Sequence, residues 1–135
     1  MYRRDTDTEL RHVLCALERQ ARAEHAISEA AAAAAAATTR RRLGGTVDAG
    51  TERGRRRVAA YFWGVVRRGA LAGEPGLGTY RARMLAATFA ADLAEAGHAP
   101  ESIAEALVSR HGAHAALSVL GAGGLRTAVV GPEPF

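Results

Sequence analysis

The segment from residue 53 to residue 68 combines the side chains best suited to binding a polyanion. Arginines stand at both ends of it, and Tyr61, Phe62 and Trp63 lie between them. A guanidinium holds a phosphate through paired donors, and an aromatic ring can stack on a nucleobase. Successive helical residues point about 100° apart, so no more than one or two of these rings can lie beside the arginines. The segment therefore predicts a nucleic-acid face, with two alternatives: aromatic core anchors ringed by arginines, or a helix lying on anionic lipid.

Basic charge is concentrated in the middle third of the chain. All 18 basic residues are arginines, and the net charge is +4. Residues 38–83 carry a net charge of +8, whereas residues 1–37 carry −1 and residues 84–135 carry −3. Such a block attracts phosphate in a salt-sensitive way, although it also suits a solvated surface that keeps a protein soluble. We expect nucleic-acid phosphates to contact nine arginines: Arg40, Arg41, Arg42, Arg53, Arg55, Arg56, Arg57, Arg67 and Arg68.

An apolar stripe in the N-terminal region predicts a second kind of contact. The stripe recurs at helical spacing, and eight consecutive alanines follow it at residues 30–37, so we expect one helix over residues 8–42. So long a helix has no obvious partner in a chain this short. The stripe is therefore predicted to pair with a second copy, forming a homodimer, or with a helix of another protein. Its residues are Leu10, Val13, Leu14 and Leu17.

Residues 94–110 resemble the first part of a bacterial helix-turn-helix. Ala94-Glu-Ala-Gly97 is followed by an Ile103-Ala-Glu-Ala-Leu107 run, as in many DNA-binding proteins of that class. The resemblance implies base reading by a second helix at residues 112–120, but this segment offers only His114 and Ser118 as polar side chains. The glycine usually found after the leucine is also missing, so we expect a plain helical hairpin here.

No motif predicts a metal, a cofactor or catalysis. Glu9-x-x-His12 and Glu95-x-x-His98 have the spacing of carboxylate-bridged di-iron bundles, yet no second pair of bridging carboxylates accompanies them. A phosphate-binding loop that ends in lysine is impossible without lysine. Cys15 lies among leucines, which suits packing better than nucleophilic attack. We expect a protein that is not an enzyme and has no catalytic residues.

Composition indicates an all-α protein. Its 32 alanines favour helices, and no apolar stretch approaches the roughly 20 residues of a membrane span. We expect a long helical region at residues 1–43, a glycine-rich hinge at 44–54, a compact bundle of three to four short helices at 55–121 and a flexible tail at 122–135. The bundle core is predicted to comprise Phe62, Trp63, Val66, Met84, Leu85, Phe89, Leu93, Ile103, Leu107 and Leu117.

These patterns lead to one functional prediction and one alternative. The single cysteine excludes an intrachain disulfide, and the charged N-terminal residues do not resemble a secretory signal, so we expect a cytoplasmic protein. We predict a small regulator of transcription, or an accessory factor, that contacts nucleic-acid phosphates through its central arginines. The alternative is a helical interaction or oligomerisation subunit that uses the leucine stripe.

Overall fold

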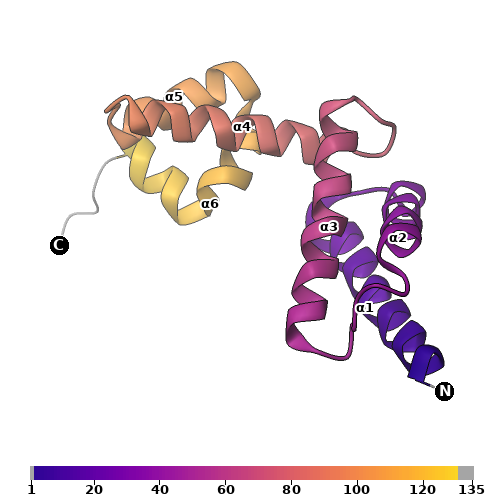
Figure 1. Cartoon of the computed structure of the whole chain (residues 1–135). Coiled ribbons are helices and arrows are strands. Elements are labelled where there is room, and N and C mark those ends of the chain that lie inside the picture. Colours follow the sequence, from indigo (N-terminus) through magenta and orange to yellow (C-terminus); the bar gives the residue numbers. More distant parts are fainter. Residues whose placement is uncertain (1, 131–135) are drawn as a thin grey trace. The chain divides into compact units, whose positions relative to one another are not determined.

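The computed structural model describes the backbone of residues 2–130 and the side chains of residues 7–121. The described residues form helices and no strands, which confirms the all-α prediction (Figure 1). The chain divides into two compact units, Met1–Arg81 and Ala82–Phe135, and the division falls inside the fourth helix. The helices are α1 (Tyr2–His25), α2 (Glu29–Leu43), α3 (Glu52–Leu71), α4 (Gly78–Glu95), α5 (Pro100–His111) and α6 (Ala113–Val130).

Unit 1 is built on α1, α2 and α3, each of which packs against the other two (Figure 1). From α3, Val58, Phe62 and Val66 are fully buried, one helical turn apart. Small side chains of α2 are buried as well, including Ala32 and Thr39, both without exposed surface. The Thr39 hydroxyl donates to the Ala35 carbonyl at 2.7 Å, so this buried polar group is satisfied within its own helix.

The single helix expected over residues 8–42 is not confirmed, because the chain turns between α1 and α2. Ala26 has a φ of 53°, and Ser28 is extended. The turn buries Ile27, which keeps 3% of its surface exposed. Ser28 caps α2, since its hydroxyl accepts a hydrogen bond from Ala31 N–H at 3.1 Å. The burial of Ile27 and the capping of α2 by Ser28 together stabilise the turn more than a continuous straight helix would be stabilised by alanine propensity.

The segment at residues 44–54, which was expected to be a hinge, is packed into unit 1. Val47 and Ala49 are buried, with 6% and 0% of their surfaces exposed. Thr51 caps α3 by accepting a hydrogen bond from Gly54 N–H at 3.0 Å, so α3 begins before residue 55. Because α3 packs with α1 and α2, the structure groups it with the N-terminal helices and not with the predicted bundle at 55–121.

Unit 2 contains α5, α6 and the greater part of α4. Its buried cluster joins all three helices and comprises Ala86, Ala90, Ile103, Leu107, Ala115 and Ala116. Of the predicted core, Leu85 and Leu117 are exposed, because they lie on the outer faces of α4 and α6. Residues 122–130, predicted to be part of a flexible tail, continue α6 beyond a kink at Gly121. Residues 131–135 lie outside the described part.

Candidate nucleic-acid interface

Seven of the nine predicted arginines lie at one end of unit 1. Helix α2 leads into the loop at residues 44–51, and α3 starts directly after it, so the last turn of α2 adjoins the first turns of α3. All seven side chains are exposed. We call this surface the arginine end, and it comprises Arg40, Arg41, Arg42, Arg53, Arg55, Arg56 and Arg57.

Arg67 and Arg68 are not part of this end. Arg67 lies ten positions after Arg57 on the same helix, which corresponds to about 15 Å along its axis. The Arg68 guanidinium lies 5.9 Å from the centroid of the Tyr61 ring, in a cation–π contact. The nine arginines therefore do not form one continuous belt, because helical rise places these two away from the others.

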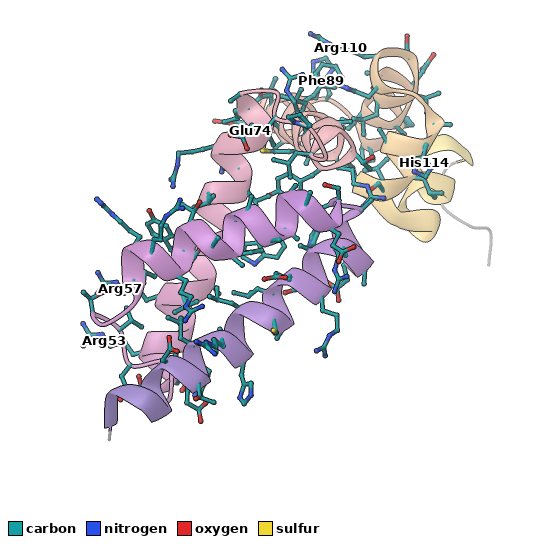
Figure 2. All side chains as sticks on the ribbon, turned by 90° about the vertical axis from the view of Figure 1, so that its right-hand side faces the viewer. Arg53, Arg57, Glu74, Phe89, Arg110 and His114 are labelled. Atoms are coloured by element: carbon teal, nitrogen blue, oxygen red, sulfur yellow. The ribbon has the colours of Figure 1, made fainter. Side chains whose placement is uncertain are left out.

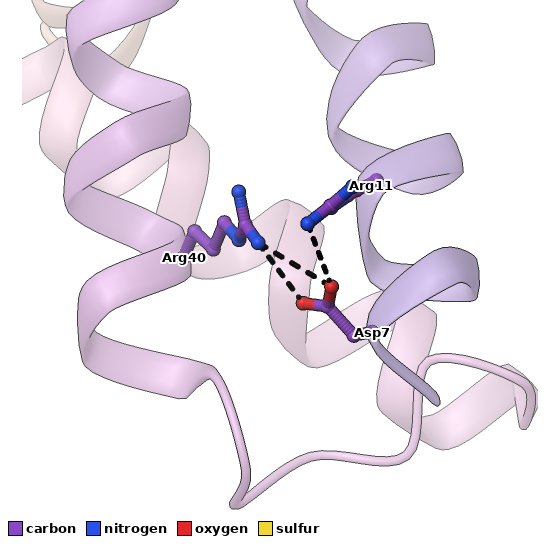
Figure 3. Close-up of polar contacts among 3 residues, drawn as sticks. All are labelled: Asp7, Arg11 and Arg40. Atoms are coloured by element: carbon purple, nitrogen blue, oxygen red, sulfur yellow. Dashed lines mark hydrogen bonds and ion pairs between the residues drawn. The ribbon is translucent and has the colours of Figure 1, made fainter. Parts of the chain in front are cut away.

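Acidic side chains neutralise part of the arginine end. Asp7 of α1 accepts hydrogen bonds from Arg40 at 3.3 Å and pairs with Arg11 at 3.1 Å (Figure 3). Glu52 pairs with Arg56 at 2.7 Å. These ion pairs are exposed, where such pairs contribute about 0–1 kcal/mol and exchange readily with other anions.

The other guanidiniums of the arginine end have no carboxylate partner among the described side chains. Arg41 donates to the Thr38 hydroxyl at 3.3 Å, and Arg55 donates to the Gly50 carbonyl at 3.0 Å. Arg42, Arg53 and Arg57 are exposed, and no described carboxylate lies within ion-pair distance of them. A guanidinium presents five N–H donors, so most of the donors at this end remain free to bind an anion.

A shallow hollow lies beside two of these free guanidiniums. Its volume is about 200 Å³. Arg53 and Arg57 stand one turn apart on α3 and extend from the same end of the helix (Figure 2). The remaining lining comes from the start of α3 and the loop before it, namely Thr46, Val47, Asp48, Thr51 and Gly54. The sequence indicated the arginines of this hollow but not its loop residues, which charge patterning does not single out.

The aromatic residues of α3 serve packing. Phe62 has no exposed surface. Trp63 is half-buried, stacked on Tyr80 with ring centroids 6.3 Å apart, and it meets the edge of the His25 ring at 4.9 Å. Tyr61 is half-buried and lies beneath the Arg68 guanidinium. The geometry favours the alternative in which Phe62 and Trp63 are packing anchors, because Phe62 is fully buried and Trp63 contacts the rings of His25, Phe62 and Tyr80.

The segment that resembles a helix-turn-helix forms a tight helical hairpin. Only Gly112, with a φ of 89°, separates α5 from α6, whereas the DNA-binding motif has a turn of about three to four residues. His114 is exposed, and the guanidinium of Arg110 lies 4.8 Å from the Phe89 ring centroid (Figure 2). The side chain of Arg110 thus packs on its own unit.

The leucine stripe predicted to bind a partner helix is covered by the chain itself. Leu10, Leu14 and Leu17 retain 2%, 4% and 8% of their surfaces exposed, and Val13 is half-buried. Because the turn at residues 26–28 folds α2 back along α1, both α2 and α3 pack against α1. The prediction that the stripe faces another molecule is therefore corrected: its partners are α2 and α3.

The remaining sequence features bring no further site together. Among the side chains of residues 7–121, no three His, Cys, Asp or Glu residues group closely enough to hold a metal ion. None of the helices within residues 2–130 has both the length and the hydropathy needed to cross a bilayer. Comparisons with protein-family models, with curated proteins and with solved structures find no match to this chain.

Proposed function

We propose that this protein binds nucleic acid through the phosphate backbone, using the arginine end of unit 1, as a regulator or accessory factor that is not an enzyme. The observation that carries the proposal is the gathering of seven exposed arginines around one helix–loop–helix junction. The described carboxylates at this junction include Asp7, Glu9, Asp48 and Glu52, against seven arginines, so its described side chains keep a positive excess. Phosphate contacts of this kind position a protein without reading sequence.

The described structure offers no side chains arranged for base reading. The start of α6, at residues 113–120, presents only His114 and Ser118 as polar side chains, and the rings of α3 are engaged in packing. We therefore propose that binding depends weakly on sequence and strongly on salt. Nothing in the described residues favours the alternative of an oligomerisation subunit, because the stripe that motivated it is buried in unit 1.

A titration at two ionic strengths tests this function. Fluorescence anisotropy with a random duplex DNA and a single-stranded RNA is measured for the parent and for R55Q/R56Q/R57Q. The matched control is R19Q/R22Q/R110Q, which removes the same charge from exposed positions outside the arginine end. We expect the first variant to bind more weakly and to lower the salt slope by about 0.9 for each phosphate that it no longer neutralises.

The control variant is expected to keep the parent's slope. Equal binding by the parent and R55Q/R56Q/R57Q at both salt concentrations would contradict the proposed function. Equal decreases in affinity of the two triple variants would contradict the placement of the interface, since only overall charge would then matter.

A further inference from the structure

The hollow lined by residues 46–57 differs from the rest of the arginine end because it is a concave surface with two arginine side chains in its lining. Arg53 and Arg57 are an i,i+4 pair on one face of α3, so both guanidiniums can reach one bound group. Elsewhere at this end, consecutive arginines such as Arg41 and Arg42 point in different directions around α2. Two donors that converge on one hollow can hold one anion in a defined place.

The other polar groups that line the hollow already have partners. The Thr46 hydroxyl donates to the Leu43 carbonyl at 3.0 Å. The Thr51 hydroxyl donates to the Asp48 carbonyl at 2.8 Å and accepts from Gly54 N–H. One carboxylate oxygen of Asp48 accepts from Gly50 N–H at 2.9 Å. The side-chain donors left for a ligand are therefore the two guanidiniums.

The charge of the lining matches one particular class of anion. Two arginines and Asp48 give the hollow a net charge of +1. A phosphodiester carries a single negative charge, whereas a terminal phosphate carries about −1.5 to −2 at neutral pH. Paired guanidinium donors also fit the oxygens of a phosphate. One phosphodiester therefore neutralises the lining, whereas a terminal phosphate would leave the occupied hollow with a net negative charge.

We propose that this hollow seats one phosphodiester group, held jointly by Arg53 and Arg57. The assignment rests on the proposed function, since the phosphodiester belongs to the backbone of the bound nucleic acid. The other arginines contribute to the attraction without a fixed contact. Two hydrogen bonds hold the loop at residues 44–51 in place beside the hollow. The Thr51 hydroxyl accepts from Gly54 N–H, and the Arg55 guanidinium donates to the Gly50 carbonyl at 3.0 Å.

The direct test uses dimethyl phosphate, a diester without sugar or base, at constant ionic strength. The arginine Nε–H signals of the full chain are followed by NMR during the titration. We expect saturable shifts at Arg53 and Arg57, and small linear shifts at Arg42. T46F fills the hollow without changing charge and is expected to abolish saturation. A23F, which places the same ring on an exposed position of α1, is expected to keep it.

A second measurement does not depend on T46F being folded. R53Q/R57Q removes the seat, and R42Q/R67Q removes the same charge from exposed arginines that do not line the hollow. We expect duplex DNA to bind R53Q/R57Q about fivefold more weakly than R42Q/R67Q at the same salt concentration. Equal affinities of these two variants for duplex DNA would contradict the proposed phosphodiester site. Linear chemical-shift changes at every arginine of the parent during the dimethyl phosphate titration would contradict it as well.

The two proposals fail in different ways. If the parent binds duplex DNA with a steep salt dependence but shows no saturable diester shift, the seat is wrong and the proposed function stands. If dimethyl phosphate saturates while neither DNA nor RNA binds at low salt, the proposed function is wrong, and the nucleic-acid backbone is excluded as the ligand of the hollow.

Discussion

The backbone carbonyl of Asp48 lies against Gly54 in the space that a β-carbon at residue 54 would occupy. Because the obstacle is backbone, the loop at residues 44–51 must move if any side chain is added there. G54A is therefore expected to lower the free energy of unfolding by about 1–3 kcal/mol and to disturb the hollow beside Arg53. Thermal unfolding followed by circular dichroism measures the first effect.

The matched control for this change is G64A on the same helix. A β-carbon at Gly64 would approach only the end of the Arg68 side chain, at 3.4 Å. Replacing a mid-helix glycine by alanine normally stabilises by about 0.5–1 kcal/mol. If G54A melted at or above the temperature of G64A, the close approach of Asp48 and Gly54 would be contradicted.

Leu14 tests whether the leucine stripe is satisfied within one chain. L14A creates a cavity under a side chain that is 4% exposed, so we expect a decrease of about 2–5 kcal/mol in the free energy of unfolding. The exposed Leu71 provides the control L71A, for which little change is expected. Melting temperatures should not depend on protein concentration. A rise in melting temperature with concentration would instead indicate an interface between copies.

Replacing Asp7 is expected to change the free energy of unfolding and the affinity for DNA in opposite directions. D7N removes the carboxylate shared by Arg11 and Arg40, and since the pairs are exposed, the free energy of unfolding should fall by less than about 1 kcal/mol. The same change frees Arg40 and adds a positive charge to the arginine end. We expect duplex DNA to bind D7N about two- to fivefold more tightly at low salt.

Glu29 provides the control for D7N, because it is exposed in the first turn of α2, the far end of that helix from Arg40. E29Q makes the same change in net charge and is expected to alter DNA affinity less than D7N. If both variants bound equally, the gain would reflect total charge, and the arginine end would not be the interface.

Ser28 tests the turn that separates α1 from α2. S28A removes the oxygen that accepts from Ala31 N–H and is expected to lower the free energy of unfolding by about 1 kcal/mol. The control is S118A, at an exposed position on α6. Chemical denaturation of both variants measures the difference, and equal midpoints would contradict a capping role for Ser28.

The sequence was sufficient to predict helices, but their grouping required tertiary information. Alanine content and the breakers at Gly97, Pro100 and Gly112 indicated where the later helices begin and end, because these are local effects. The turn at Ile27 was missed even though Ser28-Glu29 is a typical helix start. High alanine propensity on both sides favoured one straight helix, and the burial of Ile27 that decides the turn depends on distant residues.

The candidate site shows the same division. Exposure of the arginines follows from the cost of burying a charge, so it was predictable residue by residue. Their gathering at one end was not, because it depends on α3 returning beside α2 across a loop anchored by Val47 and Ala49. The separation of Arg67 from Arg57 was predictable from helical rise alone. The net charge of residues 38–83 nevertheless led to the prediction that both arginines contact the same nucleic acid.

The turn at Ala26, Ile27 and Ser28 also has a consequence for evolution of the chain. Substitutions that straightened it would join α1 and α2 into one rod and uncover the leucine face, which a second molecule would then have to cover by exchanging helices. We therefore expect variants in which the turn at residues 26–28 is straightened to form domain-swapped dimers.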